Sequence, residues 1–79
     1  MNYIATFHTH LAALRSHKRL TANGIKARQA PVPRALSSSC GTCVLYDGEE
    51  PMIELLDEDL EAVYRKDGEG YRELLRKEE

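Results

Sequence analysis

The chain has 79 residues, of which 42% are apolar and 30% are charged, and its formal net charge is −2 at pH 7. This composition is typical of a soluble globular domain, and it lacks the basic excess of a nucleic-acid-binding domain. No apolar stretch approaches the roughly 20 residues of a membrane span, and the N-terminal run is too short and too polar for a signal peptide. We therefore expect one cytoplasmic domain over residues 1–79, with neither nucleic acid nor membrane as a partner.

The first quarter of the chain predicts a strand followed by a helix. Tyr3–Phe7 is rich in aromatic and β-branched residues, which favour a strand. Thr9 can cap a helix over His10–Ala22, and Asn23 with Gly24 supplies its left-handed end. The residues at helical spacing within it are Leu11, Leu14, His17 and Leu20.

Two further strands are predicted in the middle of the chain. Ile25–Val32 alternates at first and ends among prolines, which cannot lie in a central ladder. Cys43–Tyr46 is a short apolar strand, closed by Asp47 and Gly48. The predicted order up to this point is strand, helix, strand, strand.

The last third predicts a second helix and a final strand. Asp57 can cap a helix that runs to about Lys66, with acidic residues in its first turn and basic residues in its last, in agreement with the helix dipole. Its inward side chains would be Leu60, Val63 and Tyr64. Tyr71–Leu75 favours a strand over a short helix. We interpret the carboxylates of Asp57, Glu58, Asp59 and Glu61 as the start of that helix, not as a catalytic pair.

This order predicts an α+β fold, a ferredoxin-like βαββαβ sandwich with two helices on one face of an antiparallel or mixed sheet. The first two strands would run parallel with the third between them, which places His8, Thr9, His10 and Cys40 at one edge of the sheet. A chain this short buries only about 60% of its unfolded surface. Because one sheet face would be uncovered, we expect a homodimer.

Residues 31–43 combine both cysteines with three serines and an arginine, a mixture that indicates a reactive loop. In a reducing compartment, two cysteines are more typical of catalytic, carrier or metal-binding roles than of a structural disulfide. Cys40 follows the serines and precedes Gly41, so its sulfur is expected to be accessible and near the positive end of a helix, which favours the thiolate. The alternative is a small, partly buried residue at the end of a loop.

Cys43 has two open interpretations. It could be a resolving thiol or second ligand, since Cys40-Gly41-Thr42-Cys43 is formally a CxxC motif, or it could be a strand residue that packs inward. In extended chain the two cysteines would lie about 10 Å apart, too far for a disulfide, unless the chain turns at Gly41-Thr42.

Histidines and cysteines could together form a metal site. His8, His10, Cys40 and Cys43 are the right ligand types for tetrahedral zinc, although their spacing is not that of a zinc finger. The alternative is that the histidines cap, hydrogen-bond or act as acid/base groups near the thiol.

Hydroxyls and a guanidinium near Cys40 suggest a cradle for an oxyanion. Its members would be Arg34, Ser37, Ser38, Ser39 and Gly41. The alternative is a solvated loop with an exposed arginine.

Three segments of the chain carry a family resemblance. Ala5–His10, Asn23–Ile25 and above all Pro31–Arg34 leading to Ser38–Gly41 resemble the selenium/sulfur (Se/S) carrier protein-like family of small bacterial domains. The resemblance implies that Cys40 carries sulfur or selenium as a persulfide or selenosulfide. It also implies a donor enzyme such as a cysteine desulfurase and an acceptor such as selenophosphate synthetase.

We therefore expect a carrier more than a stand-alone enzyme, with no cofactor beyond the sulfur or selenium that Cys40 holds. His8 or His10 would help to manage the thiol proton. The rival hypotheses are a zinc-binding module built on the histidines and cysteines, and a subunit that acts only by packing against a partner.

Overall fold

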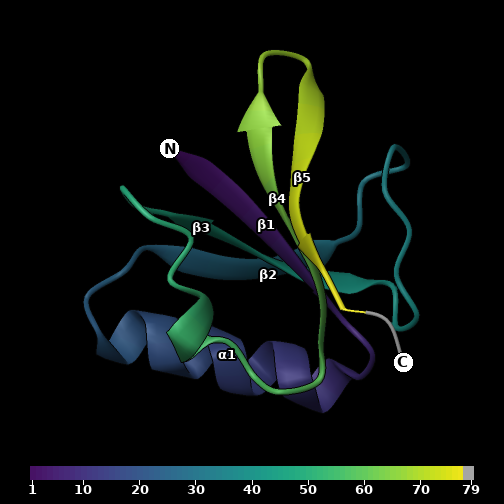
Figure 1. Cartoon of the computed structure of the whole chain (residues 1–79). Coiled ribbons are helices and arrows are strands. Elements are labelled where there is room, and N and C mark those ends of the chain that lie inside the picture. Colours follow the sequence, from purple (N-terminus) through teal and green to yellow (C-terminus); the bar gives the residue numbers. More distant parts are fainter. Residues whose placement is uncertain (78–79) are drawn as a thin grey trace.

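The computed structural model describes residues 1–77, which form a five-stranded antiparallel sheet with one long helix (Figure 1). The strand order is β2-β3-β1-β4-β5, and every neighbouring pair is antiparallel. As expected, β1 and β2 run parallel with β3 between them. The elements are β1 (Asn2–Phe7), α1 (His10–Ala22), β2 (Ala27–Pro31), β3 (Thr42–Asp47), the 3₁₀ turn η1 (Ile53–Leu55), β4 (Leu60–Asp67) and β5 (Gly70–Arg76).

Helix α1 begins and ends where the sequence predicts. The Ala12 backbone N–H donates to Thr9 Oγ1 at 3.1 Å, which makes Thr9 the N-cap. Gly24 has a φ of 78°, and the N–H of Ile25 bonds the carbonyl of Leu20 at 3.0 Å, as in a Schellman motif. No helix within residues 1–77 is both long enough and apolar enough to cross a membrane.

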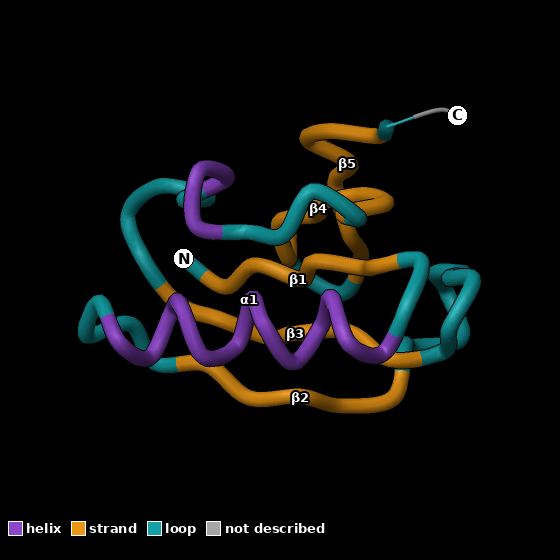
Figure 2. The backbone as a smooth tube through the Cα atoms, turned by 90° about the horizontal axis from the view of Figure 1, so that it is seen from below, coloured by secondary structure: helices purple, strands orange, loops and turns teal. Residues whose placement is uncertain are grey.

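The buried side of α1 is made mostly of small residues. Ala12, Ala13, Ser16 and Leu20 are buried, whereas Leu11 and Leu14 are exposed by 53% and 37%. Small side chains let the helix approach the sheet closely, so it lies directly along β1, β3 and β2 (Figure 2). Only Leu20 is fully buried among the four residues that the sequence places at helical spacing, which are Leu11, Leu14, His17 and Leu20.

The predicted second helix is wrong, and the ferredoxin-like βαββαβ sandwich with two helices is wrong with it. Residues 60–67 form strand β4, and the crossing from β3 to β4 contains only η1. The helical spacing that misled the prediction comes from a β-bulge in this strand. Phe7 pairs with Leu60 but Thr6 pairs with Ala62, so Glu61 is an extra residue in β4. The bulge puts Leu60 and Val63 on one face of the sheet, and this spacing of three imitates a helix.

The expected final strand at residues 71–75 is confirmed as part of β5. β5 pairs with β4 through a tight hairpin at Gly68 and Glu69. Gly68 has a φ of 62°, the left-handed value that a glycine at the first central position of such a turn supplies.

The sheet has two different faces. One face packs under α1 and η1 and carries the larger core, which includes Phe7, Leu20, Val44 and Leu60. The opposite face, called here the open face, has a smaller buried cluster made of Ile4, Cys43, Ala62 and Tyr64. No helix within residues 1–77 covers the open face, and the loop residues Val32 and Leu36 cover part of it.

Candidate functional site

Three segments that are distant in the sequence meet at one edge of the sheet. They are the end of β1, the start of α1 and the loop of residues 32–41 that joins β2 to β3, called here the cysteine loop. Ser38 Oγ donates to the Phe7 carbonyl at 3.1 Å, and Thr42 Oγ1 lies 2.9 Å from His10 Nδ1. The predicted gathering of the β1–α1 junction around the cysteine loop is therefore present.

Cys40 is a half-buried free thiol within this edge. Its Sγ donates a hydrogen bond to the Thr42 carbonyl at 3.5 Å and lies 4.0 Å from Ser38 Oγ. The side chain also packs against the core on the helix-covered face. The Cys40 side chain is thus held in one place, and the residue is only partly buried.

Gly41 shapes the chain between the two cysteines. Its φ is 76°, in the left-handed region that favours glycine. A Cβ at this position would meet no atom within 4 Å, so backbone conformation, not space, requires the glycine. The turn directs Cys40 and Cys43 to different clusters, one on the helix-covered face and one on the open face.

Cys43 is fully buried in the open-face cluster, where its Sγ donates to the Pro31 carbonyl at 3.7 Å. Burial raises the pKa of the Cys43 thiol, and the positive charge of Arg28 opposes that rise only in part. Both cysteines are free thiols. Of the two interpretations left open by the sequence, this environment favours a packing residue.

Glu61 is the site residue that sequence reasoning missed. Its carboxylate accepts the Ser39 backbone N–H at 3.3 Å and the Ser39 hydroxyl at 2.9 Å, and it lies 3.7 Å from His8 Nδ1. The signal was present in the sequence, because Glu61 is the one charged residue in the apolar run of residues 60–64. The β-bulge turns this side chain toward the cysteine loop.

The two histidines bind hydroxyl groups next to the cysteines. Ser39 has a single hydroxyl proton, which it donates to Glu61, so the 3.4 Å contact with His8 Nδ1 requires His8 to donate. His10 Nδ1 holds Thr42, two residues after Cys40. Both imidazoles therefore position the loop that carries the thiol.

The structure does not assemble the expected anion cradle around Cys40. The hydroxyls of Ser38 and Ser39 are already donated to Phe7 and Glu61, and the Glu61 carboxylate would repel an anion at Ser39. Arg34 and Ser37 are exposed, and within residues 1–77 their side chains make no hydrogen bond or ion pair.

The proposed zinc ligands are also not gathered. Among residues 1–77, no group of three or more His, Cys, Asp or Glu side chains is arranged to hold a metal ion. His10 is bound to Thr42, and Cys43 is buried in the open-face cluster.

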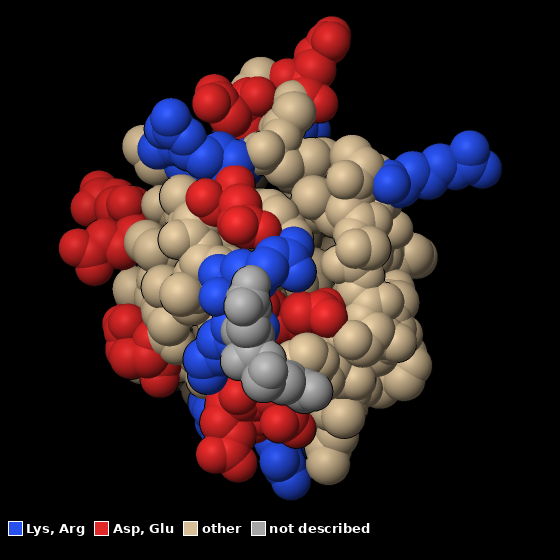
Figure 3. Space-filling model, turned by 45° about the vertical axis from the view of Figure 1, so that its right-hand side comes forward, with Lys and Arg blue, Asp and Glu red and all other residues tan. Residues whose placement is uncertain are grey.

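The surface beside the loop is mostly uncharged. Residues 35–43 contain no charged side chain. Figure 3 brings this side of the molecule forward, and its acidic and basic side chains gather beside a broad uncharged area. A partner that docks on this area desolvates few charges beyond those of Arg34 and Glu61.

The fold and the site at this edge of the sheet define a small, β-rich protein in which side-chain hydrogen bonds hold the loop that carries the Cys40 thiol. Residues 2–63 match the family described as "Putative Se/S carrier protein-like", and the chain belongs to that family. The match includes the whole cysteine loop and the start of β4 with Glu61, and it confirms the resemblance seen in the sequence. No curated protein and no solved structure matches the chain.

Proposed function

We propose that the protein carries a sulfur or selenium atom on Cys40 and passes it from a donor enzyme to an acceptor. The observation that supports this most directly is the contrast between the thiols. Cys40 is half-buried and held by the loop, whereas Cys43 is fully buried, with a raised pKa. Only Cys40 can meet a reactive group on another protein without local unfolding.

The transfer step needs no external oxidant. The Cys40 thiolate attacks the outer sulfur of a donor cysteine persulfide, the donor S–S bond breaks, and a new S–S bond forms on Cys40. The donor cysteine leaves as a thiolate and takes up a proton, while Cys40 has given its proton to solvent or a base. With an outer selenium atom, the same exchange produces a selenosulfide.

The residues around Cys40 would hold its sulfur in position more than they would increase its nucleophilicity. The Ser38 hydroxyl has one proton, which goes to Phe7, so it cannot also donate to a Cys40 thiolate. His10 and Glu61 restrain the loop on either side of Cys40 through Thr42 and Ser39. We propose a cysteine desulfurase as the donor and selenophosphate synthetase as the acceptor.

Intact mass measurement tests this function. After incubation with a cysteine desulfurase and cysteine or selenocysteine, the protein should gain the mass of one sulfur or selenium atom, and dithiothreitol should remove it. Cys40→Ser should abolish the gain, whereas Cys43→Ala, a matched thiol deletion, should keep most of it. Loading that survives Cys40→Ser would overturn the proposal, provided that circular dichroism shows both variants folded.

A further inference from the structure

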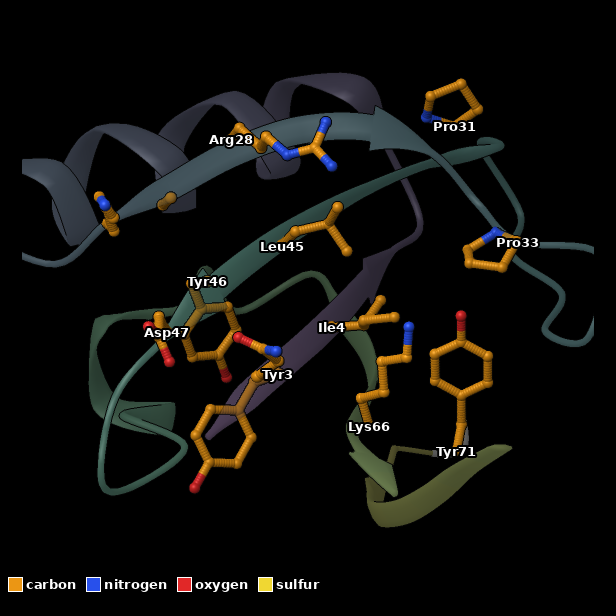
Figure 4. Close-up of a pocket in the computed structure, with 13 residues that line it drawn as sticks. Tyr3, Ile4, Arg28, Pro31, Pro33, Leu45, Tyr46, Asp47, Lys66 and Tyr71 are labelled. Carbon is orange, nitrogen blue, oxygen red and sulfur yellow. The ribbon is translucent and has the colours of Figure 1, made fainter. Parts of the chain in front are cut away.

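The open face carries a groove of about 600 Å³ that the carrier function does not use. Its floor is apolar, because Leu45 of β3 lies beside Ile4 of β1 in the sheet. At one end, the ring of Tyr71 lies below Pro33 (Figure 4). The volume and the apolar floor are typical of small-molecule sites.

Basic side chains line the same groove. Arg28 stands opposite Leu45 on β2, and Lys66 stands opposite Tyr71 on β4, so the two cations flank the apolar floor (Figure 4). Both are exposed, and within residues 1–77 neither forms an ion pair. Lys26 also lines the groove, whereas the carboxylate of Asp47 is already paired with the N-terminal amine at 3.3 Å.

This local charge opposes that of the chain as a whole, whose net charge is −2. The backbones of Arg28 and Lys66 are separated by β3 and β1, which is roughly 14 Å across the sheet at the usual strand spacing. A small inorganic anion would leave the apolar floor between them empty. A ligand that matches the groove needs both an anionic group and an apolar body.

We propose that the groove binds an organic anion, a carboxylate or phosphate attached to a flat apolar body. The body would lie over the partly buried Leu45 and stack against Tyr71, while the anionic group pairs with Arg28 or Lys66. A second copy of this chain is a poorer occupant. Two-fold packing through the open face would set the positively charged groove against itself.

Binding is tested on the full chain by following backbone amide NMR shifts during titration with naphthoate, naphthyl phosphate and the neutral naphthylmethanol. At least one anion should bind roughly tenfold more tightly than the alcohol, because the charge-assisted contact is lost in the alcohol. The largest shifts should fall at Ile4, Leu45 and Tyr71. The tighter of the two anions identifies the anionic group that is preferred.

Charge-removing variants locate the site. Arg28→Gln and Lys66→Gln together should weaken anion binding by roughly tenfold. Arg72→Gln is the matched control, since Arg72 is exposed and does not line the groove. Equal affinity for the alcohol and both anions, shifts that fall outside the groove, or equal loss with Arg72→Gln would each overturn the proposal. Cys40 plays no part in this measurement, so its result is independent of the carrier function.

Discussion

Glu61 receives both the backbone N–H and the hydroxyl of Ser39, although 22 positions separate the two residues in the chain. The bidentate contact ties the loop just before Cys40 to the bulge of β4. His8 joins the same group at 3.7 Å from the carboxylate. The position of the thiol therefore depends on a strand that is remote from the cysteine loop in sequence.

Replacing Glu61 with alanine should release this end of the loop. We expect Glu61→Ala to lower the free energy of unfolding by about 1–2 kcal/mol, since Ser39 loses both hydrogen bonds to a partly buried acceptor. Amide hydrogen exchange at residues 38–41 should quicken. The free energy is measured by urea denaturation and the exchange by NMR.

Glu61→Gln is the control for that prediction, because the amide keeps one oxygen acceptor and the shape of the side chain. It should restore part of the exchange protection at residues 38–41. If amide exchange at residues 38–41 is as slow in both variants as in the unaltered protein, the Glu61 carboxylate does not hold the loop in place.

The sequence predicted β1, α1 and the two following strands because their signals are local. Thr9 caps the helix through its own side chain, and Gly24 closes it with a left-handed φ. The position of Cys40 at the edge of the sheet near His8 and His10 could be predicted from this β-α-β arrangement. These elements depend on neighbouring residues or on short connections.

The helix predicted over residues 57–66 is wrong because pairing with a strand that is distant in the sequence decides the structure of this segment. Leu60, Val63 and Tyr64 follow helical spacing, yet pairing with β1 and a bulge at Glu61 make them a strand. Tertiary pairing overrides local preference there. The role of Glu61 was missed for the same reason, since a residue at the start of an exposed helix would have no partner in the cysteine loop.

Removing the N-cap should destabilise the end of α1 that adjoins the site. Thr9→Ala removes the oxygen that accepts the Ala12 N–H at 3.1 Å, and we expect a loss of about 1 kcal/mol. Thr9→Ser keeps that acceptor and should stay within about 0.5 kcal/mol of the unaltered protein. Urea denaturation of the three proteins measures the difference. An alanine variant as stable as the serine variant would contradict the role of the cap.

Gly41→Ala should strain the turn between the two cysteines. At a φ of 76°, a Cβ costs about 1–2 kcal/mol even though no atom lies within 4 Å of it. Gly70→Ala is the matched control, since Gly70 lacks a left-handed φ and its Cβ would make ordinary contact at 3.9 Å. Thermal unfolding should separate the variants. Equal loss of stability in both would refute the conformational explanation.

Burial of Cys43 predicts how stability depends on pH. The pKa of Cys43 is raised in the folded protein, so above the ordinary thiol pKa of about 8.5 the unfolded chain loses this proton first. The contribution of Cys43 to stability is therefore present below that pH and declines as pH rises through the window up to the folded pKa. Cys43→Ala should flatten this decline, measured by urea denaturation at several pH values. An unchanged slope in the variant would contradict it.

Reactivity should separate the two thiols most clearly. Alkylation requires a thiolate and access together, and Cys40 is half-buried whereas Cys43 is fully buried with a raised pKa. Iodoacetamide at neutral pH should therefore modify Cys40 roughly tenfold or more faster than Cys43, whose modification requires local opening of the open-face cluster. Peptide mass mapping over a time course measures both rates, and mild urea should accelerate only the slower one. Equal rates in the folded protein would mean that burial does not distinguish the thiols, and the choice of Cys40 as the carrier residue would lose its physical basis.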